Sequence, residues 1–141
     1  MVGIFSHVLF TKGAIDPARF RGKVVIVIDI LFATSTLAHP QASVLPLCAG
    51  SLGRFNLEAS YGAGHLAAHL VAQRNYSCTD VALAALYVRR GREALDVLAE
   101  SSIGRKMCAR GLSDEVEFAA RVDTLSVVPV LGEGQRIWSV A

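Results

Sequence analysis

A run of β-branched residues from Val24 to Ile28 ends in the carboxylate of Asp29, and it constrains the fold more than any other segment. A continuous apolar run of this length is typical of a parallel strand buried on both faces. We therefore expect a strand over residues 23–29 in an α/β fold. Ligands of open α/β sheets gather at the carboxyl ends of such strands, which is where Asp29 stands.

Three hydroxyl residues, Thr34, Ser35 and Thr36, follow Asp29 within seven positions. We expect them at the start of a short helix that Pro40 ends, because N–H groups and hydroxyls at a helix N-terminus suit an anionic oxygen. The pattern predicts half of a phosphate site, in which Asp29 holds a hard cation and the hydroxyls receive the phosphoryl oxygens. The alternative is that Asp29 and Thr34 only cap the following helix, which is common.

The rest of the sequence alternates strand and helix patterns, and we expect a single α/β domain over residues 1–141. Apolar residues at positions i, i+3, i+4, i+7 and i+8 predict an amphipathic helix over residues 58–74. Thr79 is expected to cap the next helix. Ser113 or Asp114 is expected to cap the last one, where Asp114 and Glu117 have the spacing of a capping box. We expect further strands over residues 2–10, 43–47, 126–131 and 135–140, and further helices over residues 79–90, 92–99, 102–110 and 114–122.

Composition narrows the classes of protein to which the chain belongs. With 52% apolar residues over 141 positions, it supports a hydrophobic core without disulfides or a structural metal. The net charge is +2, and the basic cluster at residues 89–92 is too short to indicate nucleic-acid binding. No apolar run is long enough to cross a membrane, and the N-terminus lacks a signal-peptide pattern, so we expect a cytoplasmic location. Cys48, Cys78 and Cys108 form no CxxC pair, which agrees with a reducing compartment.

Two other sites are weighed against simpler explanations. His65 and His69 lie four positions apart on the helix expected over residues 58–74, a spacing that can hold zinc. Leu66 stands where a metalloprotease needs Glu, and no third ligand is apparent, so we expect both imidazoles on the polar face of the helix. Ser51 lies between glycines but without the GxSxG spacing of a nucleophile elbow, so the sequence does not indicate a serine hydrolase.

Several segments together carry a resemblance to a known family. They are Arg21-Gly22-Lys23 followed by VVIVID and ATST, then CAGSLGRFNLE, YGAG, TDVALAA, SIGR and VVPVL. In this order they resemble the 2-phosphosulfolactate phosphatase family, the Mg-dependent phosphatases of coenzyme M biosynthesis and their bacterial relatives. Residues 1–39 resemble the N-terminal part of the family and residues 41–141 the C-terminal part. The resemblance implies a three-layer α/β/α fold around a mixed sheet, shortened here, a Mg²⁺ ion and the hydrolysis of a small anionic phosphate ester.

The resemblance also implies roles for particular residues. The metal ligands would be Asp29 and Glu58, and the residues at the reacting phosphate would be Asp29, Thr34 and Ser35. The phosphoryl oxygens would be received by Thr34, Ser35 and Thr36, with Arg54 or Arg105 supplying a cation. Two nucleophiles remain open, a water activated by the metal ion or the carboxylate of Asp29 itself.

Three departures from the family fall on this chemistry. A long central block between the ATST and CAG segments is absent, and residues 39–41 mark the join. Phe32 stands where the family has Arg, and Ala59 where it has the Asp of a Glu-Asp pair. A phenyl ring cannot bind phosphate in the bidentate way of Arg, and phosphoryl transfer depends on such charge neutralisation. The alternative function is therefore a catalytically inactive, truncated homologue that oligomerises or binds an anion. Because the loss of central strands exposes sheet edges, we also expect a homo-oligomer.

Overall fold

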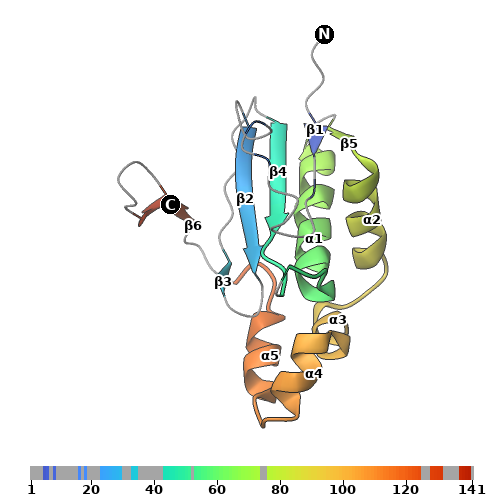
Figure 1. Ribbon diagram of the computed structural model, residues 1–141, viewed down its shortest axis with the longest axis vertical. Helices are drawn as coiled ribbons and strands as arrows, with labels where there is room; N and C mark the ends of the chain where they lie inside the picture. Colours follow the sequence, from blue (N-terminus) through green and yellow to red (C-terminus); the bar gives the residue numbers. More distant parts are fainter. Residues whose placement is uncertain are drawn as a thin grey trace.

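A five-stranded mixed sheet forms the centre of the computed structural model (Figure 1). The structure describes residues 5–6, 8, 16, 18, 23–29, 33–34, 43–51, 53–73, 76–124, 128–131 and 137–140. Strands β2 (Lys23–Asp29) and β4 (Ser43–Cys48) run parallel, in a register that pairs Lys23 with Ser43 and Ile28 with Cys48. The sheet order is β3-β2-β4-β1-β5, where β1 (Phe5–Ser6) and β5 (Ser77–Cys78) are parallel neighbours and β3 (Ala33–Thr34) pairs antiparallel with the end of β2.

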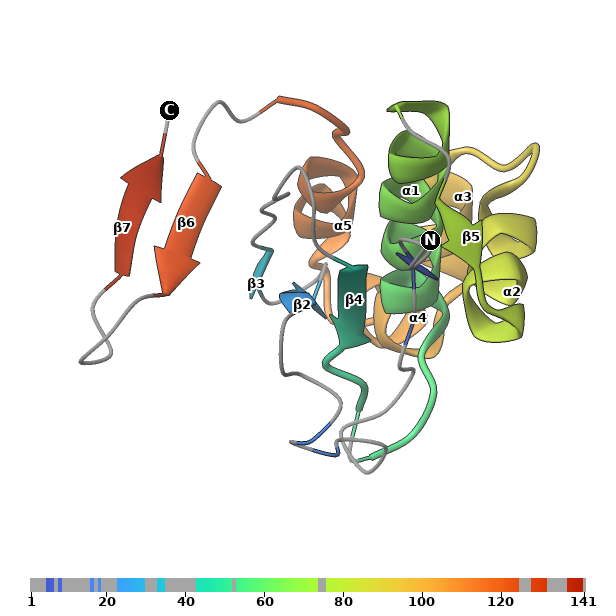
Figure 2. The ribbon, with the colours of Figure 1, turned by 90° about the horizontal axis from the view of Figure 1, so that it is seen from above.

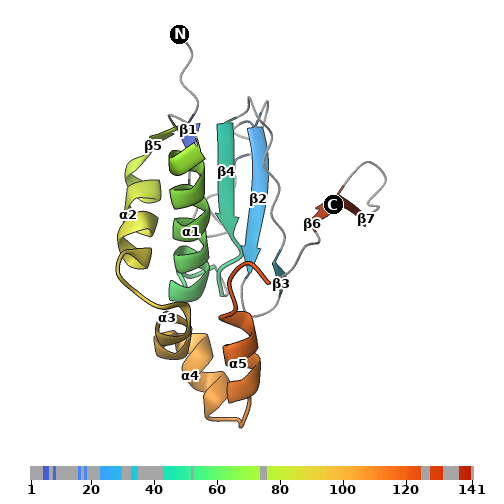
Figure 3. The same cartoon turned by 180° about the vertical axis from the view of Figure 1, so that it is seen from behind.

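The helices of the described chain fall into two groups. Helix α1 (Leu57–Gln73) packs on β2 and β4, and α2 (Asp80–Arg89) packs along α1 on the same side of the sheet. The other three, α3 (Ala94–Glu100), α4 (Ser102–Cys108) and α5 (Ser113–Ala119), lie beyond the carboxyl ends of β2 and β4 (Figure 3). We call these three helices the helical lobe. The expected α/β class and mixed sheet are confirmed, and a second helical layer on the other face of the sheet stays an expectation.

A β-hairpin stands apart from the sheet. Strands β6 (Val128–Leu131) and β7 (Ile137–Val140) pair antiparallel, with Val128 opposite Val140. Viewed from above, this hairpin lies beyond β3, on the far side of the sheet from α2 (Figure 2). The hairpin expected from the sequence is thus confirmed over the residues that the structure describes.

The sheet-side core is the apolar cluster between the sheet and the helices α1 and α2. Ile26 and Ile28 of β2 point toward α1, and the small side chains of Ala59 and Ala63 let that helix lie close to the strands. Helices α1 and α2 approach each other even more closely at Gly64. A Cβ atom there would lie 2.2 Å from the carbonyl oxygen of Ala85, so only glycine fits.

A second apolar cluster holds the helical lobe together. Tyr61 of α1 packs there with Val97, Leu98 and Val116, all at most 4% exposed. The turn between α3 and α4 is fixed by Ser101, whose buried hydroxyl accepts a hydrogen bond from the backbone N–H of Gly104 at 2.9 Å. Helix α1 therefore belongs to both regions, because Tyr61 packs in the lobe while Ala59 and Ala63 pack in the sheet-side core.

Two local predictions are wrong. Thr34 lies in strand β3 and does not begin a helix, because β3 pairs antiparallel with the end of β2 and satisfies backbone groups on the side of β2 that faces away from β4. The capping box at Asp114 is also absent, because α5 already begins at Ser113 and its N-cap Leu112 makes no side-chain capping bond. Thr79 does cap α2, accepting a hydrogen bond from the N–H of Ala82 at 3.4 Å. No helix within the described ranges is long and apolar enough to cross a membrane.

Candidate functional site

The carboxyl edge of the sheet brings three segments together. Ile28 and Cys48 form the last residue pair of β2 and β4, and the N–H of Ala49 donates to the carbonyl of Ile28 at 2.8 Å. Asp29 is the next residue of β2, and its side chain lies outside the described part of the chain. The segment after Ala49 leads directly into α1. The end of β2, the start of this connection and the first turn of α1 thus share one edge.

Glu58, in the first turn of α1, is the buried carboxylate of this edge. Its side chain is 3% exposed, and its Oε2 atom has no hydrogen-bond partner among the described residues. Glu58 lies near the thiol of Cys48, which is the last residue of β4. Burial raises the pKa of Cys48 to about 12, with a further contribution from the negative charge of Glu58. The thiol also donates to the carbonyl of Ala59 at 3.4 Å.

Asn56, the residue before α1, adds a second unpaired oxygen that the sequence reasoning missed. Its Oδ1 atom is buried without a partner in the described structure, whereas its backbone carbonyl accepts from Ser60 Oγ at 2.7 Å. Carboxylate and amide oxygens are the ligands of hard cations such as Mg²⁺. Asn56 and Glu58 therefore fit the metal that the family resemblance implies. The signal in the sequence was the Asn-Leu-Glu triplet, which sets two oxygen ligands around a helix start.

The described side chains alone do not complete a metal site. They contain no group of three or more His, Cys, Asp or Glu residues that could hold a metal ion. His69 is exposed and pairs with Gln73 at 2.6 Å, which agrees with the polar-face interpretation for this residue. A complete site at the carboxyl edge needs the carboxylate of Asp29, which stays a prediction.

The residues expected to bind phosphate are placed unequally. The backbone of Thr34 lies opposite Ile28, one residue from Asp29, so the antiparallel turn still brings it to the carboxyl edge. Ser35 and Thr36 lie outside the described residues, as does Phe32. The side chain of Thr34 is likewise outside them.

The two candidate cations lie in different regions. Arg54 is exposed in the connection between β4 and α1, where its backbone pairs with Ser51 across a tight turn that contains Gly53 at φ 75°. Arg105 is exposed on α4 and donates to the backbone carbonyl of Glu100 within the helical lobe. Arg54 thus belongs to the segment that borders the carboxyl edge, whereas Arg105 is held by the α3–α4 turn.

Ala59 shows what the departure from the family means in space. It lies in the first turn of α1, is 1% exposed and packs in the sheet-side core. A carboxylate at this position would stand beside Glu58 in sequence but would point toward the apolar cluster.

Comparisons with known proteins agree with the sequence motifs. The profile of the family described as 2-phosphosulpholactate phosphatase matches residues 37–134. A probable 2-phosphosulfolactate phosphatase of Deinococcus radiodurans is 33% identical over 106 residues, covering 74% of this chain and 44% of the relative. A protein of the same description from Symbiobacterium thermophilum is 32% identical over 102 residues, covering 70% of this chain and 44% of the relative. The chain thus spans less than half the length of these relatives.

Proposed function

Because the chain belongs to the 2-phosphosulfolactate phosphatase family, we propose that it hydrolyses a small phosphate ester at the carboxyl edge of its sheet. The products are an alcohol and inorganic phosphate. The observation that carries this proposal is the pair of buried, unpaired oxygens at the start of α1, Asn56 Oδ1 and Glu58 Oε2. Buried polar atoms without partners are rare in folded proteins, so two of them at a strand-end edge favour a ligand there.

The residues would divide the work in the following way. Asn56, Glu58 and Asp29 would hold Mg²⁺ through oxygen atoms, and the bound ion would neutralise negative charge on the phosphoryl oxygens. The hydroxyls of residues 34–36 would donate hydrogen bonds to those oxygens and orient the phosphoryl group. Arg54 is the cation of the adjoining connection, and its guanidinium is suited to a phosphate oxygen.

The test is phosphate release from 2-phosphosulfolactate and from 4-nitrophenyl phosphate, measured across a Mg²⁺ titration. We expect Glu58→Gln to lower the rate by about 10²-fold or more, since it removes a charge from the site. Glu115→Gln, an exposed carboxylate of α5, is the matched control and should retain the wild-type rate. Absence of phosphate release from either ester at every Mg²⁺ concentration would refute the proposal.

A binding measurement separates the metal from the reaction. Mg²⁺ should raise the melting temperature of the wild type and of Glu115→Gln, because a ligand that binds only the folded state stabilises it. The same ion should leave Glu58→Gln unchanged. An equal rise in all three proteins would place the metal away from α1.

The second candidate function is an inactive homologue that assembles with copies of itself. The observations that favour it are Ala59, which replaces a family carboxylate, and Val27, which is 50% exposed on the face of the sheet that carries Leu45 and Leu47. Light scattering after size-exclusion chromatography distinguishes the two candidates. A monomer that releases phosphate supports the enzyme, and an oligomer without turnover supports the alternative.

A further inference from the structure

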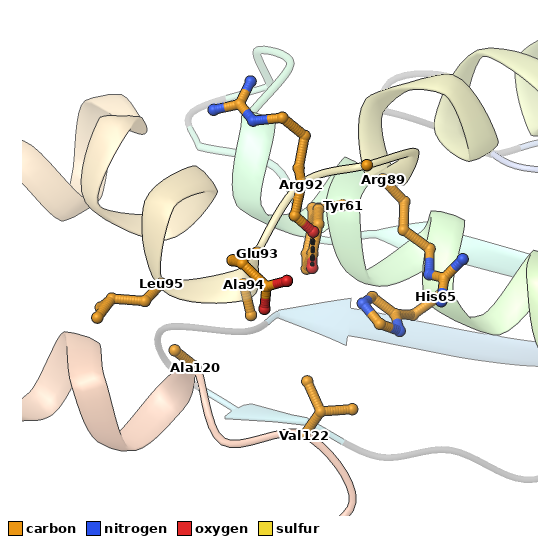
Figure 4. Close-up of a pocket in the computed structure, with 10 residues that line it drawn as sticks. Tyr61, His65, Arg89, Arg92, Glu93, Ala94, Leu95, Ala120 and Val122 are labelled. Carbon is orange, nitrogen blue, oxygen red and sulfur yellow. Dashed lines mark hydrogen bonds between the residues drawn. The ribbon is translucent and has the colours of Figure 1, made fainter.

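A pocket of about 470 Å³ opens at the seam between α1 and the helical lobe (Figure 4). Its walls come from α1, from the connection between α2 and α3, and from the segment that follows α5. Tyr61, His65 and Arg89 form a polar wall, and Leu95 and Val122 belong to the apolar part of the lining. The volume lies in the range of pockets that hold small metabolites.

Two atoms of the polar wall have no partner. His65 Nε2 and Arg89 Nε are buried, and neither makes a hydrogen bond within the described structure. Figure 4 shows the imidazole and the guanidinium side by side on the same wall. Burial, and next the charge of Arg89, lower the pKa of His65, while Asp123 acts in the opposite direction. The ring is therefore neutral near pH 7 and can carry its proton on Nε2.

The other charged groups around the pocket have defined positions. The guanidinium of Arg92 points away from the pocket and pairs with Glu100 at 2.5 Å, while its carbonyl accepts from Tyr61 Oη at 3.0 Å. Among the described residues, this leaves Arg89 as the cation that faces the pocket. The carboxylate of Glu93 points toward the same space and repels every negative charge on a ligand, so the single positive charge of Arg89 can offset one such charge but not two.

We propose that this pocket binds a small organic acid with a single negative charge, such as a short-chain carboxylate. Its oxyanion accepts hydrogen bonds from Arg89 Nε and from His65 Nε2, which gives both buried atoms the partner they lack. Its carbon chain packs against Val122, which lies near His65 in the lining (Figure 4). This inference does not rest on the proposed phosphatase function, because no residue that lines the pocket is among those proposed to hold Mg²⁺ or the phosphoryl group.

The test is an NMR titration of the histidine ring signals with butyrate, in the absence of Mg²⁺. Butyrate should shift the His65 signals saturably, while the signals of exposed His69 stay in place. Butanol, which lacks the charge, and inorganic phosphate, which carries more of it, should each bind at least about tenfold more weakly. Binding of phosphate as tight as that of butyrate would overturn the single-charge assignment.

Matched variants locate the binding. Arg89→Lys keeps the positive charge but removes the Nε donor, and we expect it to weaken butyrate binding about tenfold. Arg90→Lys, the exposed neighbour outside the pocket lining, should bind as the wild type does. Circular dichroism of both variants shows whether they are folded. If Arg89→Lys is folded and binds butyrate with unchanged affinity, the proposal is wrong.

A further variant separates this pocket from the carboxyl edge. Asp29→Asn should abolish the proposed phosphatase activity and leave butyrate binding unchanged. Loss of butyrate binding in this variant would mean that the two sites are one, which would overturn the inference and leave the phosphatase proposal standing.

Discussion

The sheet-side core and the helical lobe are stabilised in different ways, although they share helix α1. In the sheet-side core, a six-pair parallel ladder and the close backbone approach at Gly64 join segments far apart in sequence. In the lobe, three seven-residue helices follow one another directly and depend on a small apolar cluster and on the Ser101 cap. Helices this short are marginal by themselves, so the lobe depends on α1 for its packing.

The two regions also differ in where buried polar atoms of the described residues lack partners. In both regions the buried apolar side chains pack against one another. The buried polar atoms that lack partners in the described structure lie at two other places, the start of α1 and the side of α1 that faces the lobe. Asn56 and Glu58 mark the first place, and His65 and Arg89 mark the second. Polar atoms left without partners between well-packed regions are the expected locations of ligands.

The largest effect is expected for Gly64→Ala, which tests the sheet-side core. The new methyl group would meet backbone atoms of Ala85, at 2.2 Å from the oxygen and 2.9 Å from the carbon, and these cannot rotate away. We expect the free energy of unfolding to fall by about 3 kcal/mol or more in denaturant titrations. Gly111→Ala is the control, because open space surrounds that glycine and only its φ of 77° opposes the change, at about 1 kcal/mol. Equal losses in both variants would contradict the close approach of α1 and α2.

A smaller and local effect is expected for Gly104→Ala in the lobe. Its Cβ would meet the carbonyl oxygen of Leu98 even more closely than the Cβ at Gly64 meets Ala85, but the lobe can open without the sheet-side core, so we expect a loss of only about 2 kcal/mol. Because the lobe has its own apolar cluster, hydrogen exchange should quicken in α3 and α4 before it does in α1. Uniform acceleration across α1 and the lobe would show that the two regions unfold as one unit.

The third prediction concerns the cap between α3 and α4. Ser101→Ala removes the acceptor of the Gly104 N–H and should lower the free energy of unfolding by about 1 kcal/mol. The neighbouring Ser102 is exposed, so Ser102→Ala should change stability little. Thermal melts of both variants and of the wild type measure the two effects. A larger loss for Ser102→Ala than for Ser101→Ala would refute the assigned cap.

The smallest effect is expected from the pH dependence of His65. Its pKa in the folded protein is lowered from 6.5, mainly by burial and then by Arg89. The unfolded chain therefore binds the proton more readily, so the contribution is complete above pH 6.5 and is lost as the pH falls through the folded pKa. Between pH 7 and pH 5, the melting temperature of the wild type should fall more than that of His65→Gln. Parallel decreases would show that other groups govern the acid sensitivity.

Much of the architecture could be predicted from local sequence patterns. The β-branched run gave β2 with its bounds, the apolar spacing gave α1 to within one residue at each end, and Thr79 gave the cap of α2. Strand β3 was missed because two residues carry no periodicity, and its pairing depends on the neighbouring strand. Gly111 directly follows the helix expected over residues 102–110, and it adopts a positive φ of 77° at that end of the helix.

The candidate sites were harder to predict than the fold. The family motifs led us to expect Asp29 and Glu58 in one site. The backbone brings the end of β2 and the start of α1 to the same edge of the sheet, and the meeting of the two carboxylates stays a prediction. The pocket could not be predicted, because Tyr61 and Arg89 lie 28 positions apart and meet only through the packing of α1 on α2. His65 stands out in the pocket because its Nε2 atom is buried without a hydrogen-bond partner among the described residues. No spacing pattern in the sequence reports this property, since it arises only when the chain is folded.

The hydrogen bond from Tyr61 to the carbonyl of Arg92 has a thermodynamic consequence. It links α1 to the connection between α2 and α3, which forms part of the pocket wall and leads into the first helix of the lobe. A molecule that binds this wall only while the lobe is packed must therefore lower the population of the open lobe, and loosening helices α3, α4 and α5 must weaken its affinity by the same factor.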